Sequence, residues 1–179
     1  MSFAGRHILS IDQFTRPDLE MLLAVAQTLE PVARREYRCN VLEGAVMANL
    51  FFEASTRTRI SFHTAFSRLG GRVCDTTGFT FSSISKGESL HDTARVISGY
   101  ADAIVMRHPE TGSVAQFAKG LRVPVINAGD GTGEHPSQAL LDYYTINREF
   151  ARLGKSIDGM TITLVGDLKH GRTIQSLCR

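Results

Sequence analysis

Short apolar runs alternate with segments of helical periodicity along most of this chain, and that alternation limits the folds open to it. The expected strands are 46–52, 72–75, 103–106, 123–127 and 160–165. The expected helices are 16–34, 56–69, 88–100 and 136–153, with one or two helical turns at 113–119 and another helix beginning near Arg172. Strands that alternate with helices form parallel sheets whose faces the helices cover. We therefore predict an α/β fold, a three-layer domain with a mostly parallel sheet flanked by helices.

The expected elements are distributed unevenly along the chain. Residues 1–135 contain four of the five expected strands, and 136–153 form one long helix. Residues 154–179 contain only one strand and the beginning of one helix. A single strand and helix cannot bury their own faces. We expect either that the chain is a fragment with the truncated start of a second α/β domain, or that this last segment docks on the first domain or on another subunit.

The composition argues against several classes of protein. The 179 residues carry a net charge of +2, which gives no basic surface for nucleic acid, and no apolar run has the length of a membrane span. The N-terminus does not have the pattern of a secretory signal peptide. The three cysteines fit neither a disulfide framework nor a zinc site. We therefore expect a cytoplasmic protein without a bound metal and with no nucleic-acid or membrane partner.

A cluster of hydroxyl and guanidinium groups lies where the helix 56–69 should begin. Ser55, Thr56, Arg57 and Thr58 follow directly after the first expected strand. The free amide groups of a first helical turn attract anions, and hydroxyl groups and a bidentate guanidinium add donors for phosphate oxygens. The cluster therefore predicts a phosphate site that needs no glycine-rich loop. A well-capped helix with two surface arginines is the competing interpretation, and these residues alone leave it open.

Other polar residues follow the later strands. Ligands of parallel α/β sheets bind beyond the carboxyl ends of the strands, which makes Arg107, His135 and Arg172 candidates. The positive end of a helix favours a neutral His135 that can donate one hydrogen bond to a carbonyl oxygen, and Gln138 lies one turn further on. Lys86, in a long polar loop, is a weak candidate by itself. A salt bridge for Arg107 and a purely structural helix cap for His135 remain alternatives.

Five separated motifs together resemble the aspartate and ornithine carbamoyltransferase family. They follow one another in the family's order: Phe51-Phe52-Glu53-Ala54-Ser55-Thr56-Arg57-Thr58-Arg59, Ala103-Ile104-Val105-Met106-Arg107-His108-Pro109, Asn127-Ala128-Gly129-Asp130-Gly131, His135-Pro136-Ser137-Gln138 and Val165-Gly166-Asp167-Leu168-Lys169-His170-Gly171-Arg172. Lys86 and Ser137 are more similar to the aspartate branch. The resemblance implies a carbamoyl-phosphate-binding domain at 1–135, a connecting helix at 136–153 and an incomplete start of an aspartate-binding domain at 154–179.

The resemblance implies a carbamoyl transfer without a cofactor. The carbamoyl group would pass from carbamoyl phosphate to the amine of L-aspartate, giving N-carbamoyl-L-aspartate and phosphate, a step of de novo pyrimidine biosynthesis. The implied catalytic residues are Arg57, Thr58, Arg107 and His135. The implied substrate-binding residues are Ser55, Thr56, Arg57 and Thr58 for phosphate, Thr58, Arg107, His135 and Gln138 for the carbamoyl group, and Arg172 for an aspartate carboxylate.

Further implied contacts come from a second subunit. Ser82 and Lys86 would reach into the site of a neighbouring subunit, where Lys86 would contact the phosphate and an aspartate carboxylate. A site shared in this way implies a closed oligomer, a homotrimer in this family. The resemblance also allows regulatory subunits or a dihydroorotase as partner chains.

The resemblance covers only the beginning of the second domain, so we expect this chain by itself to have little or no transferase activity. Two other interpretations remain. One is an ornithine carbamoyltransferase. The other is a non-catalytic carbamoyltransferase homologue that acts as an assembly partner, although the retained polar residues argue against it.

Overall fold

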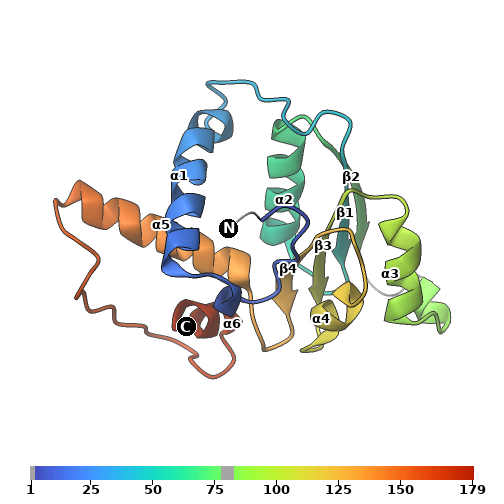
Figure 1. Cartoon of the computed structure of the whole chain (residues 1–179). Helices are drawn as coiled ribbons and strands as arrows, with labels where there is room; N and C mark the ends of the chain where they lie inside the picture. The colour runs from blue at the N-terminus through green and yellow to red at the C-terminus, as the bar shows by residue number, and fades with distance from the viewer. Residues whose placement is uncertain (1–2, 78–82) are drawn as a thin grey trace.

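The computed structural model describes residues 3–77 and 83–179, so Ser82, one of the predicted site residues, lies outside the described part of the chain. The helices are α1 (Arg16–Ala33), α2 (Thr56–Arg68), α3 (Leu90–Ser98), α4 (Ser113–Ala118), α5 (Pro136–Arg152) and α6 (Arg172–Leu177), with short 3-10 helices η1 (Ile11–Gln13) and η2 (Ser83–Lys86). The strands are β1 (Val46–Phe51), β2 (Arg72–Thr77), β3 (Ala103–His108) and β4 (Val125–Asp130). Figure 1 shows how these elements are arranged.

The strands form a parallel sheet in the order β2-β1-β3-β4. The chain leaves β1 toward β2 on one side and then returns to place β3 on the other side of β1. The strand order therefore reverses between β1 and β3. In open α/β sheets the crevice at such a reversal, beyond the carboxyl ends of the strands, is where ligands bind. Ser55 to Thr58 follow β1 and Arg107 lies near the end of β3, so the predicted phosphate cluster falls at this crevice.

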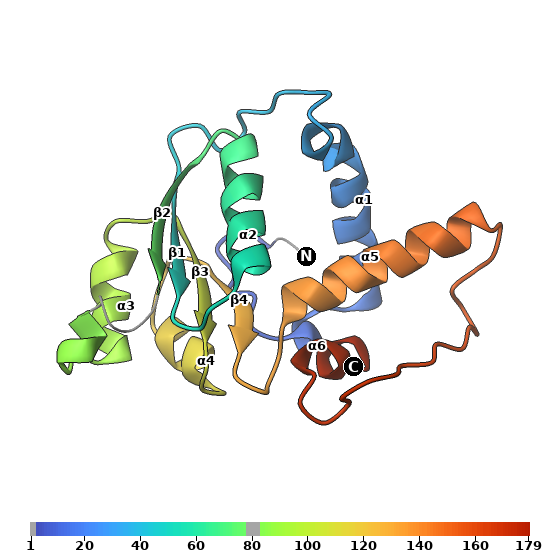
Figure 2. The same ribbon diagram turned by 180° about the vertical axis from the view of Figure 1, so that it is seen from behind.

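Helices cover both faces of the sheet, which confirms the predicted three-layer arrangement (Figures 1 and 2). Alternate residues of β1 point to opposite faces, as a strand requires. Ala48 and Leu50 belong to a core that includes side chains of α3 and α4. Met47 and Phe51 belong to a second core, against which Phe62 of α2 packs. The two cores fix the positions of β1 and α2, and with them the turn that carries the phosphate cluster.

Most of the expected elements are confirmed, but the fifth strand is wrong. Residues 160–165 form no strand, and Val165 is 89 % exposed. A strand needs a neighbour to accept its backbone hydrogen bonds, and the described residues offer none to this segment. The helix expected near Arg172 is present as α6, which packs against α5.

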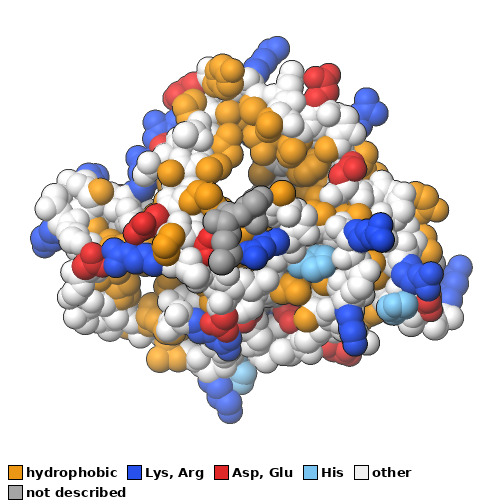
Figure 3. Space-filling view, in the orientation of Figure 1, with side chains coloured by type: hydrophobic (Ala, Val, Ile, Leu, Met, Phe, Trp, Pro, Cys, Tyr) orange, Lys and Arg blue, Asp and Glu red, His pale blue; other side chains and the backbone are white. Residues whose placement is uncertain are grey.

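Helix α1 lies away from the sheet, beside α2 and α5 (Figures 1 and 2). Its ion pairs include Glu30 with Arg148 of α5, and Arg16 with Asp158 at 3.0 Å. Apolar side chains stay partly exposed on α1, among them Met21 and Val25, and Figure 3 shows hydrophobic side chains gathered over α1 and α2. Among the described residues, no helix is both long and apolar enough to cross a membrane.

Candidate active site

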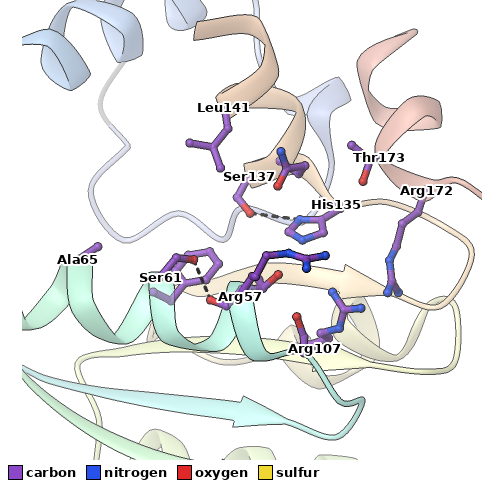
Figure 4. A pocket seen from close by; sticks show the side chains of 13 residues that line it. Arg57, Ser61, Ala65, Arg107, His135, Ser137, Leu141, Arg172 and Thr173 are labelled. Atoms are coloured by element: carbon purple, nitrogen blue, oxygen red, sulfur yellow. Dashed lines mark hydrogen bonds between the residues drawn. The ribbon is translucent and has the colours of Figure 1, made fainter. Parts of the chain in front are cut away.

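One cavity collects most of the predicted site residues at the crevice between β1 and β3 (Figure 4). Its volume is about 780 Å³. The predicted residues that line it are Ser55, Arg57, Thr58, Arg107, His135, Gln138 and Arg172. These side chains come from four parts of the fold: the start of α2, the end of β3, the start of α5 and the start of α6. Folding therefore brings together residues that the sequence had only placed at separate strand ends.

The start of α2 presents donors that the helix itself does not use. Ser55 is the N-cap residue, but its hydroxyl group makes no capping hydrogen bond. This absence weakens the interpretation of the cluster as a simple helix cap. Arg57 is exposed and Thr58 partly buried, and both line the cavity, whereas Thr56 does not. Successive helical residues point about 100° apart, so Thr56 at the first helical position faces elsewhere.

Glu53 holds the two arginines of the cavity together. Its Oε2 atom lies 2.9 Å from Nε of Arg107 and 2.8 Å from Nη2 of Arg172. The first contact is an ion pair, and among the described residues Arg107 Nε has no partner that meets the geometry of a hydrogen bond. Arg107 also donates to the carbonyl of Ala128 at 3.2 Å, and Arg172 to that of Gly131 at 2.6 Å. The side chains of Arg107 and Arg172 are only 11 % and 15 % exposed, so both guanidinium groups are held in place.

This part of the cavity is positively charged. Burial lowers the pKa of Arg107, as does the nearby charge of Arg172, while Glu53 opposes both effects. Arg57 adds a third guanidinium group. The carboxylate of Glu53 pairs with two of these three guanidinium groups, and an anionic ligand would balance the remaining charge. The arrangement explains Arg107 as a member of a charged cluster with room for a ligand, rather than as half of an isolated salt bridge.

His135 is the N-cap residue of α5 and is 6 % exposed. Burial lowers its pKa to about 4, and the charges of Arg107 and Arg172 add to the effect. The imidazole is therefore neutral near pH 7, as the sequence predicted, although the chief cause is burial rather than the helix end. Ser137 Oγ lies 3.2 Å from His135 Nδ1 (Figure 4), and the backbone amide of His135 donates to the buried Ser176 Oγ at 3.0 Å.

The remaining predicted residues differ in their placement. Gln138 lines the cavity, and its amide group donates to Asp142 at 3.0 Å. Lys86 ends η2 with an exposed side chain and is not among the residues that line the cavity. Ser82 lies outside the described residues. The structure thus leaves the predicted role of Lys86 and Ser82 in a neighbouring subunit as a prediction.

Several cavity residues were missed by the sequence analysis. Ser61, Phe62 and Ala65 of α2 lie on the same helix face as Thr58, at the spacing of three and four residues that defines such a face. That periodicity could have found them. Glu53 had no such signal, because its partners are far away in the sequence. Ser137 and Leu141 of α5 and Thr173 of α6 complete the lining.

The geometry suits a ligand with an anionic end and a carbonyl group. Free amides, hydroxyl groups and Arg57 gather at one end of the cavity, and Arg107 and a neutral His135 lie where they can donate to a carbonyl oxygen. Within residues 3–77 and 83–179, no group of three or more His, Cys, Asp or Glu side chains could hold a metal ion.

A family model described as "Aspartate/ornithine carbamoyltransferase, carbamoyl-P binding domain" matches residues 6–148. The chain is 77 % identical over its whole length to the aspartate carbamoyltransferase catalytic subunit of Dichelobacter nodosus, of which it covers 51 %. It is 62 % identical to that of Saccharophagus degradans, again over its whole length and over 53 % of the relative. The chain thus spans about half the length of these curated relatives.

Solved structures match the chain over a similar extent. Aspartate transcarbamoylase from Trypanosoma cruzi in complex with carbamoyl phosphate and aspartate matches with a TM-score of 0.89 and 44 % identity, over 97 % of this chain and 53 % of that one. The complex of that enzyme with carbamoyl aspartate and phosphate matches equally well, over 97 % of this chain and 55 % of that one.

Proposed function

Because the chain belongs to the aspartate/ornithine carbamoyltransferase family, we propose that it supplies the carbamoyl-phosphate half of an aspartate carbamoyltransferase active site. The observation that carries the proposal is the single cavity in which Arg57, Thr58, Arg107, His135 and Arg172 meet. The relatives named above are aspartate enzymes, which supports aspartate rather than ornithine as the acceptor. The reaction would belong to de novo pyrimidine biosynthesis.

Carbamoyl phosphate would bind with its phosphate at the start of α2. The backbone amides of the first turn, that of Thr56 among them, and the hydroxyl groups of Ser55 and Thr58 would donate to phosphate oxygens, and Arg57 would bind two of them. Arg107, His135 and Thr58 would donate to the carbamoyl oxygen, and Gln138 would position the carbamoyl amine. The affinity of the cavity for an anion follows from the excess of guanidinium groups over the single carboxylate of Glu53.

The transfer would proceed through a tetrahedral intermediate. The amine nitrogen of L-aspartate forms a bond to the carbamoyl carbon, and the bond from that carbon to the phosphate oxygen then breaks. The amine nitrogen loses a proton, which the departing phosphate accepts. Arg107 and a neutral His135 would stabilise the negative charge that develops on the carbamoyl oxygen, in the manner of an oxyanion hole. Holding two anionic substrates side by side supplies much of the remaining rate enhancement.

We further propose the assembly and the division of the chain that the resemblance implies. Residues 1–135 would be the carbamoyl-phosphate domain, 136–153 a connecting helix and 154–179 the start of the aspartate domain, with Arg172 as a ligand of an aspartate carboxylate. Ser82 and Lys86 would complete the site of a neighbouring subunit in a cytoplasmic homotrimer. Lys86 does not line the cavity of its own chain, which is compatible with a role in another subunit.

A direct assay tests the proposal. The full-length protein that contains this chain is mixed with carbamoyl phosphate and either L-aspartate or L-ornithine, and the carbamoylated product is measured. We expect carbamoyl aspartate and little carbamoyl ornithine. The reverse preference would establish the ornithine alternative. Absence of both products from a folded, trimeric protein would favour a non-catalytic assembly partner.

A further inference from the structure

The two ring nitrogens of His135 have different surroundings. Nδ1 lies 3.2 Å from the hydroxyl oxygen of Ser137, two residues along the chain (Figure 4). Nε2 is then the nitrogen left for a ligand in the cavity. A neutral imidazole has one nitrogen that donates and one that accepts, and the partner of one nitrogen decides the role of the other. The hydroxyl group of Ser137 is therefore placed to decide what His135 offers to a substrate.

The available partners favour a hydroxyl group that donates. Among the described residues, the His135 ring is the one recorded hydrogen-bond partner of the Ser137 side chain. The competing acceptor for a proton on Nδ1 is the carbonyl oxygen of His135 itself. That oxygen already accepts hydrogen bonds from the amides of Gln138 at 3.0 Å and Ala139 at 3.2 Å, as the first turn of α5 requires. A proton on Nδ1 could bond only to this already occupied oxygen, and it would leave the Ser137 hydroxyl proton without an acceptor among the described residues.

We propose that the hydroxyl group of Ser137 donates to Nδ1 of His135 and so places the ring proton on Nε2, where the neutral histidine donates to a ligand in the cavity. Ser137 would then be a positioning residue, because it acts on the reaction through His135. The catalytic consequence rests on the proposed function, whereas the position of the proton does not.

The hydrogen bond from Ser137 decides whether the buried, neutral His135 can donate to a substrate. In the opposite tautomer, Nε2 would carry a lone pair and could not donate to a carbamoyl oxygen. A hydrogen bond to the neutral form of a base also disfavours protonation. Removal of the Ser137 hydroxyl should therefore raise the pKa of His135 and allow both tautomers. The backbone at His135 would stay in place, since its amide donates to Ser176 Oγ.

Nitrogen NMR of the ¹⁵N-histidine-labelled protein measures the tautomer directly, because protonated and bare ring nitrogens resonate far apart. We expect His135 of the unsubstituted protein to be neutral at pH 7 with its proton on Nε2. Ser137→Ala should give a mixture of tautomers, and Ser137→Thr, which keeps the hydroxyl group, should restore the single one. A proton on Nδ1 in the unsubstituted protein overturns the proposal, whether or not the Ser137→Ala variant folds.

Kinetics of the full-length protein provide the second measurement. Loss of one hydrogen bond that orients the donor should lower kcat by about three- to tenfold with little change in KM for carbamoyl phosphate. The acidic limb of the pH profile should move to higher pH, and Ser137→Thr should recover most of the rate. Thr145→Ala is the matched control, because it removes a hydroxyl group of the same helix that, among the described residues, bonds only to the carbonyl of Leu141.

An unchanged tautomer and a kcat within about twofold of the parent in Ser137→Ala would also overturn the proposal. Failure of this proposal can be distinguished from failure of the proposed function. A protein that transfers no carbamoyl group would refute the function, yet the NMR measurement would still decide the position of the proton on His135.

Discussion

Replacement of Glu53 by glutamine tests how the two buried arginines are held. The substitution keeps the size of the side chain but removes the negative charge between Arg107 and Arg172, which are 2.9 and 2.8 Å from Oε2. The hydrogen bond from Arg172 to the charged carboxylate contributes about 1.5–3 kcal/mol, and the ion pair with Arg107 adds to this stabilisation. Because the amide oxygen in the Glu53→Gln variant would still accept one hydrogen bond, we expect the free energy of unfolding to fall by about 2–3 kcal/mol in total. Urea denaturation at low salt, without phosphate, measures the change.

A matched carboxylate provides the control. Glu149 pairs with Arg152 at 2.8 Å, but the two side chains are 55 % and 69 % exposed. Such surface pairs contribute at most about 1 kcal/mol, so Glu149→Gln should have a much smaller effect. Added phosphate should stabilise the Glu53→Gln variant more than the parent, since an anion can replace the lost charge. Equal effects of the two substitutions, or no extra gain from phosphate, would refute this account of the cavity.

Three further outcomes follow from the same structure. The pKa of His135 is lowered to about 4 from 6.5, so the unfolded state binds more protons than the folded state between these pH values. The free energy of unfolding should therefore fall by up to about 3 kcal/mol as the pH drops from 6.5 to 4. Urea denaturation at several pH values should show that the free energy of unfolding depends less on pH in His135→Gln. Gly129→Ala would place a Cβ atom 2.9 Å from one arginine guanidinium group and 3.2 Å from the other, so it should weaken phosphate binding. Gly131→Ala would instead place its Cβ atom 2.5 Å from the backbone nitrogen of Thr111 and should mainly lower stability. Phe117→Ala should cost about 3–5 kcal/mol of unfolding free energy, measured by thermal denaturation, because the ring is fully buried.

Much of the fold could be predicted because local pattern and tertiary structure agree here. The alternation of Ala48 and Leu50 with Met47 and Phe51 already marks a strand with two buried faces. The strand order could not be predicted, because it depends on which strands pair with one another when the chain folds. The error at 160–165 has the same origin: the residues suit a strand, but a strand exists only beside a partner.

The site was predicted to the extent that each residue lies at a strand end or helix start. That rule placed Arg57, Arg107, His135 and Arg172 correctly around one cavity. It could not identify Glu53 as the link between two arginines, because nothing in its local sequence separates it from a solvated carboxylate. Thr56 belongs to the predicted cluster but is not among the residues that line the cavity, a detail set by the position at which α2 begins.

The start of α2 should bind the phosphate group of a carbamoyl donor. Calorimetric titration with N-(phosphonacetyl)-L-aspartate, which binds the Trypanosoma cruzi enzyme, tests it most directly. The parent protein should bind, and Arg57→Ala should lose about 2 kcal/mol or more of binding free energy, roughly thirtyfold in affinity. Arg59→Ala is the control, because the Arg59 guanidinium lies 3.9 Å from Asp75 and does not line the cavity. Unchanged affinity in Arg57→Ala, or an equal loss in both variants, would contradict the account.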